Sequence, residues 1–225
     1  MPLKPRITAW VGPMYSEKTE EAKRQWRVAT AIPGLEVVYL KPKLDTRYGD
    51  PRIVRSHADP DDFDPKIPVT LVEKAGDVWE VGKQADVLIL DEGQMLPPSI
   101  ARVLLRLYME RGVRVNYFGL DLTWQGRYWA TTSEVITLPE TKVFKEKGLC
   151  ALCHGNSRWS QKLRNGIPVH IFDPQATTFE VGEQELYRAL CWDCWFKTTP
   201  GAQQALDQGL IGSVDPETYW GEPPK

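Results

Sequence analysis

Residues 12–19 constrain the fold more than any other part of the chain, because they form a glycine-led polar segment between two regular patterns. They read Gly-Pro-Met-Tyr-Ser-Glu-Lys-Thr. The apolar residues 7–11 before them predict a strand, and the Ala- and charge-rich residues 20–30 after them predict a helix. A strand, a glycine loop and a helix in this order are typical of an α/β fold that binds phosphate groups.

The loop resembles the phosphate-binding pattern G-x-x-x-x-G-K-[ST] at three of its four defining positions, which are Gly12, Lys18 and Thr19. In that pattern, backbone N–H groups surround the phosphates, the lysine reaches the β and γ oxygens, and the hydroxyl binds Mg²⁺. Glu17 stands where the second glycine belongs. The segment therefore predicts a nucleotide-binding loop with one unusual residue.

Three interpretations of Glu17 stay open. A carboxylate about 6 Å from a phosphate charge costs about 3 kcal/mol at an effective dielectric of roughly 20, which is about a hundredfold in affinity. Alternatively, the side chain turns to solvent and pairs with a cation, which leaves the backbone N–H in place. The residue could also be an engineered or sequencing-level change.

The first 125 residues alternate strand-like and helix-like segments, as in a mostly parallel sheet covered by helices. The run at residues 86–90 is apolar after its first residue, which is typical of a strand buried on both faces. Further strands are expected at residues 36–40, 69–72 and 113–118, and a helix is expected at residues 99–111 with Gly112 as its cap.

Composition limits the class of protein. A chain of 225 residues can form one large core with a small satellite domain. With 28 basic and 30 acidic residues, it lacks the basic character of duplex-binding proteins. No apolar run reaches the roughly 18 residues that span a bilayer, and no signal peptide is recognised. We therefore expect a cytoplasmic protein without membrane or nucleic-acid partners, in which cysteines are more often metal ligands than disulfides.

An acidic pair, Asp91-Glu92, follows the most hydrophobic strand. This is the usual place for the acid that organises Mg²⁺ beside a phosphate loop. Neighbouring side chains point to different sides of an extended chain, so one acid can serve the metal while the other acts as a general base. The simpler alternative is that both acids are only solvated.

The four cysteines form two Cys-x-x-Cys pairs, Cys150 with Cys153 and Cys191 with Cys194. Two such pairs can hold a tetrahedral Zn²⁺ through four thiolates, and a closed site of this kind is structural. Two redox pairs or four inert core cysteines are the alternatives, and His154 could replace one ligand.

The pattern divides the chain into a nucleotide-binding α/β domain at residues 1–145, a zinc-binding domain at 146–197 and a tail at 198–225 that is expected to be loosely attached. The Asn165-Gly166 pair predicts a type I′ hairpin in the second unit. Six tryptophans lie in the second half of the chain, and packing around a small metal domain is the simplest role for five of them, Trp124, Trp129, Trp159, Trp192 and Trp195. Trp192 and Trp195 fit that role, whereas Trp124 is placed to stack on a flat ligand.

Taken together, these motifs resemble the type II thymidine kinases over about residues 6–197. The family's G-P-M-F-S-G-K-T is similar to residues 12–19, its K-P-x-x-D-x-R-Y to residues 41–48, its S-H to Ser56-His57, its D-E-x-Q to residues 91–94 and its G-L-D-x-x-F to residues 119–124. Both cysteine pairs, Val181-Gly182 and Tyr187 match as well. The resemblance implies a RecA-like phosphate-loop core with a mostly parallel sheet and a small zinc-bound lasso domain.

The resemblance also implies site residues for phosphate transfer from ATP. Glu92 is expected to take the proton of the nucleoside 5′-hydroxyl, and Arg47 to steady the transferring phosphate. The expected ATP and Mg²⁺ ligands are Gly12, Pro13, Met14, Tyr15, Ser16, Glu17, Lys18, Thr19, Asp45 and Asp91.

The implied nucleoside pocket holds the base largely through main-chain groups of the lasso. Its expected members are Met14, Leu120, Trp124, Ser160, Val181, Gly182 and Tyr187. Trp124 replaces a usual Phe and Ser160 a usual Thr, so thymidine, deoxyuridine or a modified pyrimidine could be the substrate.

By resemblance, the chain is thus expected to be an ATP-dependent thymidine kinase with Mg²⁺ bound alongside ATP, a structural Zn²⁺ and a dimeric or tetrameric assembly. The alternative is a kinase-derived binding protein whose catalysis was lost at Glu17.

Overall fold

The computed structural model describes residues 6–46, 50–54, 67–178, 180 and 185–218. Its main element is a sheet of six parallel strands in the order β3-β2-β4-β5-β1-β6. These strands are β1 (Ile7–Val11), β2 (Val37–Pro42), β3 (Val69–Val72), β4 (Val87–Leu90), β5 (Arg114–Gly119) and β6 (Thr141–Lys145).

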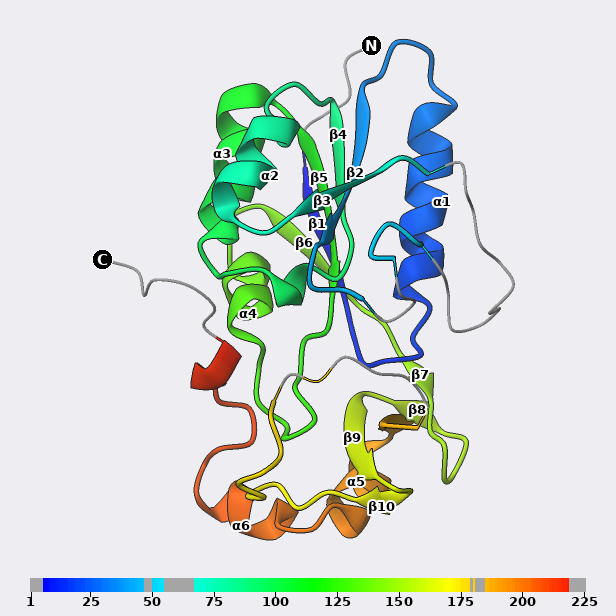
Figure 1. Cartoon of the computed structure of the whole chain (residues 1–225), viewed down its shortest axis with the longest axis vertical. Coiled ribbons are helices and arrows are strands. Elements are labelled where there is room, and N and C mark those ends of the chain that lie inside the picture. The colour runs from blue at the N-terminus through cyan, green and yellow to red at the C-terminus, as the bar shows by residue number, and fades with distance from the viewer. Residues whose placement is uncertain (1–5, 47–49, 55–66, 179, 181–184, 219–225) are drawn as a thin grey trace.

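Helices cover both faces of this sheet (Figure 1). Helix α1 (Lys18–Thr30) lies on one face, while α2 (Ala75–Gly82), α3 (Ile100–Arg111) and α4 (Ala130–Ile136) lie on the other. Every residue of β1 and β4 is buried, because apolar side chains on both faces of these strands meet helices. The α/β class with a mostly parallel sheet is thereby confirmed.

Separate apolar clusters fill the two sides of the sheet. The cluster on the α2–α4 side includes Leu88, Leu104 and Val115. On the α1 side, the Trp10 ring stacks on Phe118 with 4.7 Å between ring centroids and on Phe144 with 5.5 Å. Both clusters fix the strand ends that carry the site.

The predicted elements of the core are present. Strands β1 and β3 match their predicted ranges, and the other three predicted strands differ by one or two residues at their ends. Helix α1 begins at Lys18, earlier than predicted, because Glu17 takes the N-cap position. Gly112 ends α3 with a φ of 71°. Helices α2 and α4 and strand β6 were not predicted.

The second unit is built on a three-stranded sheet in the order β10-β9-β11, below the core in Figure 1. It comprises β7 (Gly148–Leu149), β8 (Asn156–Ser157), β9 (Trp159–Arg164), β10 (Ile167–Pro168), β11 (Tyr187–Leu190) and α5 (Trp192–Thr198). The predicted Asn165-Gly166 hairpin is confirmed, since both residues have positive φ (52° and 76°) and Arg164 pairs with Ile167.

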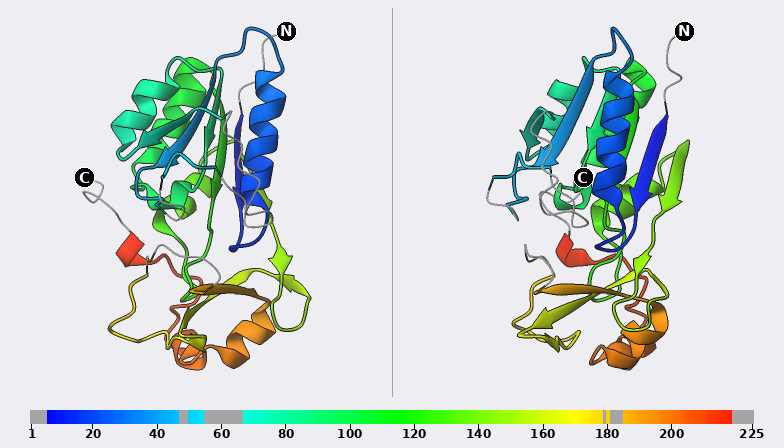
Figure 2. Two further views of the ribbon diagram at one scale, coloured as in Figure 1. Left: turned by 45° about the vertical axis from the view of Figure 1, so that its right-hand side comes forward. Right: turned by 90° about the vertical axis from the view of Figure 1, so that its right-hand side faces the viewer.

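Residues 199–218, which we call the C-terminal strap, return from this second unit to the core near α4 (Figures 1 and 2). The strap contains α6 (Ala202–Asp207) and the short 3₁₀ helix η2 (Pro216–Thr218). Its backbone pairs with the loop before α4: Tyr128 N donates to Ser213 O at 2.7 Å, and Asp215 N donates to Tyr128 O at 2.8 Å. Residues 219–225 of the predicted tail lie outside the described residues.

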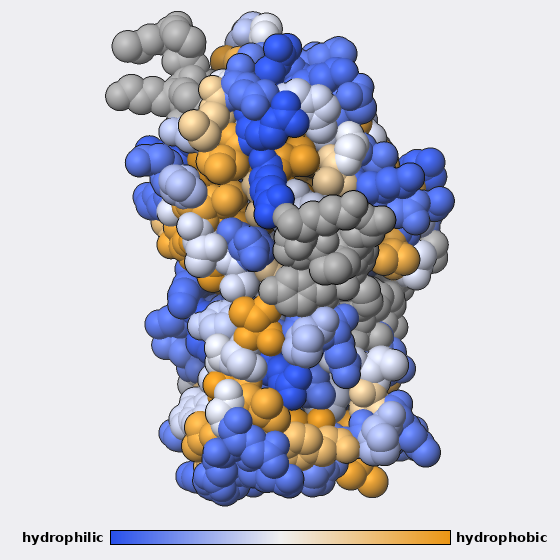
Figure 3. Space-filling model, turned by 90° about the vertical axis from the view of Figure 1, so that its left-hand side faces the viewer, coloured by the Kyte–Doolittle hydropathy of each residue, from blue (hydrophilic) through white to orange (hydrophobic). Residues whose placement is uncertain are grey.

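The surface over α2 and α3 mixes hydrophilic and hydrophobic side chains (Figure 3). Among the described residues, no helix has the length and apolar character needed to cross a bilayer.

Candidate functional site

The loops that follow β1, β2, β4 and β5 meet at one edge of the sheet, since these strands are parallel neighbours. Strand β1 leads into Gly12, β4 into Asp91, and β5 into Asp121. The register confirms that these positions are adjacent: Val11 is paired with Gly119, and Asp91 N donates to Leu40 O at 3.0 Å. Polar residues from distant parts of the sequence therefore converge on one edge.

The loop after β1 requires glycine at its first position. A Cβ at Gly12 would lie 2.6 Å from the backbone oxygen of Glu146, so only glycine permits this close approach. At the other end, Lys18 is buried and its Nζ donates to Pro13 O at 2.6 Å and to Ser16 Oγ at 3.1 Å. The ammonium group of Lys18 therefore folds back onto the loop that precedes α1.

Glu17 adopts a left-handed backbone conformation with φ 59° and ψ 18°. This region favours glycine, which explains why the pattern G-x-x-x-x-G-K-[ST] has glycine here. The Glu17 side chain is exposed. It lines a surface groove of about 720 Å³ that also includes Arg6 and Lys147. Of the interpretations of this residue, the geometry favours a side chain turned to solvent.

The acidic pair after β4 is buried rather than freely solvated, with Asp91 3% and Glu92 8% exposed. Tyr39 OH donates to Asp91 Oδ2 at 3.0 Å. Burial and the neighbouring Asp91 charge raise the pKa of Tyr39 well above its usual value, so the phenol remains a donor. The Asp91 carboxylate is therefore fixed at the end of its strand.

Glu92 is held by a chain of hydrogen bonds through Gln94. Its Oε2 accepts from Gln94 Nε2 at 2.7 Å, and Gln94 Oε1 accepts from Leu120 N at 3.1 Å. Gln94 lies in η1 (Gly93–Met95) and is 1% exposed. Glu92 itself has a φ of 55°, a strained conformation that often accompanies functional sites. The Gln94 amide thus orients the Glu92 carboxylate with respect to the loop after β5.

Asp45 follows β2 and is buried in an ion pair with Lys41, whose Nζ lies 2.8 Å from Asp45 Oδ2. Lys41 Nζ also donates to Ile53 O at 2.8 Å. Arg47, predicted to act on the transferring phosphate, lies outside the described residues.

The residues predicted to surround a base gather where the second unit meets the core. Met14, Trp124 and Tyr187 are buried in one apolar cluster, and Leu120 packs against it. Met14 N lies 3.4 Å from Ser160 Oγ, which links the phosphate-loop segment to β9. Val181 and Gly182 lie outside the described residues.

The segment before Val181 is anchored by side chains of both units. Thr177 O accepts from Trp124 Nε1 at 3.2 Å and from Lys162 Nζ at 2.9 Å. Lys162 Nζ also pairs with Glu180 Oε2 at 2.6 Å, and Tyr187 OH donates to Glu180 O at 3.1 Å. Trp124, predicted to stack on a ligand, thus also holds main chain through its indole N–H.

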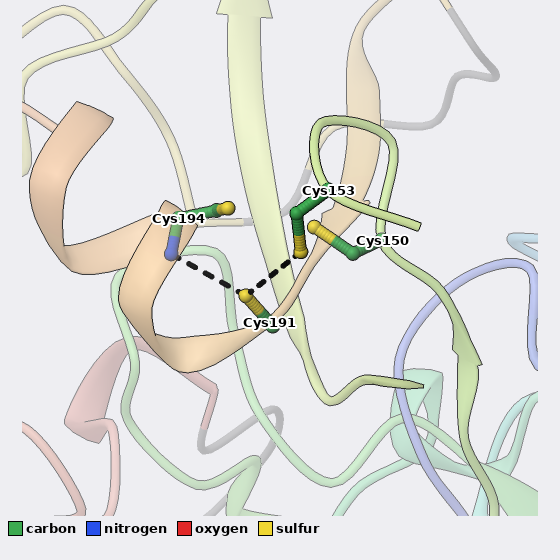
Figure 4. A group of neighbouring side chains, drawn as sticks. All are labelled: Cys150, Cys153, Cys191 and Cys194. Atoms are coloured by element: carbon green, nitrogen blue, oxygen red, sulfur yellow. Dashed lines mark hydrogen bonds between the residues drawn. The ribbon is translucent and has the colours of Figure 1, made fainter. Parts of the chain in front are cut away.

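The four cysteines lie together, with all their Sγ atoms within 4.8 Å of one another (Figure 4). Cys150 and Cys153 come from the β7–β8 turn, while Cys191 caps α5 and Cys194 lies in its first turn. Zn–S bonds of about 2.3 Å in a tetrahedron place sulfurs about 3.8 Å apart, and Cys153 and Cys191 are separated by 3.6 Å. The cluster therefore fits a structural zinc site.

In the absence of a metal ion, the thiols of this cluster differ in acidity. Burial opposes ionisation of Cys150, but backbone hydrogen bonds from Cys153, Cys191 and Leu152 outweigh it and lower the pKa of this thiol to about 6. The hydrogen bond with Cys191, together with burial, raises the pKa of Cys194 to about 12. A bound cation would favour four thiolates at once. Within the described residues, the cluster consists of the cysteines without His154.

Aromatic rings cover this centre. Trp195 is fully buried, and its ring lies 4.8 Å from that of Trp159. Trp192 is 37% exposed and its ring lies 4.9 Å from that of Phe196. Both tryptophans therefore belong to the packing of the small unit.

Several residues of the site were missed in the sequence. Tyr39 lies within the predicted strand 36–40, where nothing distinguishes a site residue from a packing one. Lys41 begins the segment 41–48 that resembles the family but received no role, and Lys162 lies where no element was predicted. The Asp121 carboxylate, which pairs with Arg158 across the two units, follows a predicted strand and could have been found by that position.

Two comparisons of the sequence with known proteins agree on one family. The family described as thymidine kinase matches residues 6–195. A thymidine kinase of Pseudothermotoga lettingae is 28% identical over 193 residues, which cover 85% of this chain and 95% of the relative.

Among solved structures, the chain is similar to a Pif1 helicase studied for unwinding of forked duplex DNA, with a TM-score of 0.30 and 22% identity over 54% of this chain and 31% of that one. It is also similar to Bacteroides Pif1 bound to single-stranded DNA, with a TM-score of 0.30 and 19% identity over 53% of this chain and 30% of that one. The chain thus spans less than a third of each helicase, and TM-scores this low support no functional comparison.

Proposed function

Because the chain belongs to the thymidine kinase family and is a kinase, we propose that it transfers the γ-phosphate of ATP to the 5′-hydroxyl of thymidine or a related deoxypyrimidine nucleoside. The nucleoside oxygen forms a bond to the γ-phosphorus, the bond from phosphorus to the bridging oxygen of ADP breaks, and the hydroxyl proton passes to a carboxylate. The products are the nucleoside 5′-monophosphate and ADP.

In this proposal the loop of residues 12–19 holds the phosphates. Its backbone N–H groups and the Lys18 ammonium would meet the β and γ oxygens, and Thr19 and Asp91 would hold Mg²⁺. The Mg²⁺ ion would offset the negative charge that develops on the phosphates. Tyr39 supports this role for Asp91, because its hydrogen bond keeps one carboxylate oxygen in place.

Glu92 would be the general base. A base must lie within hydrogen-bond reach of the proton that it takes, so its orientation matters as much as its pKa. The contact from Gln94 Nε2 to Glu92 Oε2 orients the carboxylate that would accept the proton. This held carboxylate, directly after Asp91 at the edge where the phosphate loop lies, is the observation that carries the proposal. Arg47 and Asp45 would position the transferred phosphate.

The nucleoside would lie among Met14, Leu120, Trp124, Ser160 and Tyr187, with main-chain groups around Val181 and Gly182 recognising the base. The shared apolar cluster of Met14, Trp124 and Tyr187 supports this placement. A pocket closed by Trp124 suits a single pyrimidine ring better than a purine. The zinc site would maintain the shape of the lasso domain without taking part in the chemistry, and we expect a cytoplasmic homodimer or homotetramer.

A second candidate function rests on Glu17. If its carboxylate prevents productive ATP binding, the chain would be a kinase-derived nucleoside-binding protein. One assay decides between the two functions: purified protein is incubated with thymidine, Mg²⁺ and radiolabelled ATP. The kinase is supported if the parent protein forms labelled thymidine monophosphate, if Lys18→Met does not, and if the control variant Lys43→Met, changed at an exposed lysine, still does. Thymidine binding without turnover in the parent protein would support the alternative.

A further inference from the structure

The C-terminal strap touches the predicted base-binding segment. The family match ends at residue 195, so the strap of residues 199–218 lies beyond it. Thr178, which directly follows the anchored Thr177, is 4% exposed. Its Oγ1 lies 2.7 Å from Glu217 Oε2 in the strap. This contact joins parts of the chain that are 39 residues apart.

Two more acceptors lie near Thr178, one in the loop after β5 and one in the strap. Its Oγ1 lies 3.0 Å from Gln125 Oε1 and 3.4 Å from Asp215 Oδ2. A hydroxyl has one hydrogen to donate, and the Glu217 carboxylate is the closest of its acceptors. A hydrogen bond to a charged group contributes more than one between neutral groups. The Thr178–Glu217 contact is therefore the dominant one in this group.

The strap that presents Glu217 is itself fixed to the core. Asp215 is fully buried, accepts from Glu217 N at 3.0 Å and lies 3.8 Å from Arg127 Nη1. At the end of the strap, Thr218 Oγ1 accepts from Ala130 N at 2.9 Å, at the start of α4. Glu217 is thus held in place by the core, although it lies at the surface.

On one side of Thr178, Thr177 O is bound by Trp124, a predicted wall of the base pocket. Resting on the proposed function, we propose that Glu217 is a positioning residue for the nucleoside site: through Thr178, it fixes the lasso segment at Thr177 and Thr178 against the core, beside Trp124. The strap then determines nucleoside affinity without touching ATP or the reacting atoms.

The test compares Thr178→Val, Thr178→Ser and Glu217→Ala with the parent protein, and uses Thr30→Val as a control. Thr30 Oγ1 donates to Trp26 O at the far end of α1, so this control removes a hydroxyl away from the lasso. Measured quantities are the Kd and KM for thymidine, the KM for ATP, kcat, and hydrogen exchange of peptides covering residues 170–190.

We expect Thr178→Val and Glu217→Ala to raise the Kd and KM for thymidine about fivefold or more, as for one lost hydrogen bond. Their kcat and KM for ATP should stay within about twofold of the parent, and hydrogen exchange in the peptides should accelerate. Thr178→Ser, which keeps the hydroxyl, should have the thymidine affinity and the hydrogen exchange of the parent protein.

Unchanged thymidine affinity and exchange in Thr178→Val would overturn the proposal. So would a Thr178→Ser variant as weak as Thr178→Val, because packing and not the hydroxyl would then matter. An increase in the KM for ATP as large as the increase in the KM for thymidine would also contradict the proposal. If the parent protein binds no nucleoside, the proposed function fails by itself, and the exchange measurement alone decides whether Glu217 fixes the lasso.

Discussion

Replacing Glu17 separates the effect of its charge from the effect of its backbone conformation. The residue has a φ of 59° and an exposed side chain. An exposed carboxylate is surrounded by water, so its repulsion of a phosphate charge about 6 Å away falls to about 0.7 kcal/mol at a dielectric of roughly 80. This corresponds to about threefold in ATP affinity, and salt reduces it further.

The backbone contributes separately. A side chain in the left-handed region costs roughly 1–2 kcal/mol, whereas glycine adopts it freely but loses more entropy on folding. We therefore expect Glu17→Gly to stabilise the protein by about 1 kcal/mol, or about 2–4 °C in Tm. Glu17→Gln removes the charge and keeps the Cβ, so it should leave Tm nearly unchanged.

The assay measures the ATP Kd by titration at low and high salt, and Tm by calorimetry, for the parent and both variants. Tightening of ATP binding by about threefold or less in both variants, with a gain in Tm only in Glu17→Gly, is the expected pattern. If both variants bind ATP tenfold or more tightly, the carboxylate does face the phosphates. A glycine variant without a gain in Tm would refute the reasoning about the backbone.

Three further predictions concern other residues. Glu92→Gln should keep the Kd for ATP and thymidine while lowering kcat by about 10² to 10⁴, and steady-state kinetics at the parent rate would exclude Glu92 as the base. Protein prepared without chelators should carry about one zinc per chain by metal analysis, and Cys191→Ser should lose zinc and thymidine binding before the α/β core unfolds in a thermal scan. Burial raises the pKa of Asp215 above its usual value of 3.8, so the folded state binds the carboxyl proton more tightly than the unfolded state does. This proton binding stabilises the fold fully below about pH 3.8, and the stabilisation is lost as pH rises through the folded-state pKa. In urea unfolding, the free energy of unfolding of the parent should therefore fall relative to that of Asp215→Asn as pH rises from about 4. If the difference between the two free energies stays constant with pH, the raised pKa is contradicted.

The core was predictable because its local patterns and its tertiary environment agree. The apolar run of β4 is buried on both faces, as its composition requires, and Gly112 ends α3 where the periodic pattern stops. Helix α2 was missed because two of its eight residues, Gly76 and Gly82, are glycines. A weak helix former is stabilised there by packing against α3, which no local pattern reveals.

The site was predictable where a residue type coincides with a strand end or with a characteristic spacing. Asp91 and Glu92 have such positions, and the cysteine pairs were found by their spacing, whereas Gln94 and Tyr39 act through contacts between distant segments. The Thr178–Glu217 contact has no local signal either, because it depends on where the strap meets the lasso. The nucleoside and ATP roles of the individual residues remain predictions.

The second unit is joined to the core at both of its chain ends and also by side chains between those ends, and this limits how it can move. Its chain enters after β6, where Glu146 N donates to Val11 O at 2.7 Å, and leaves through the pairing of Asp215 with Tyr128. Between these ends, Arg158 pairs with Asp121, and Trp124 Nε1 donates to Thr177 O at 3.2 Å. Swinging of the whole unit would break these contacts, so a bulky molecule would have to enter by local opening of the second unit.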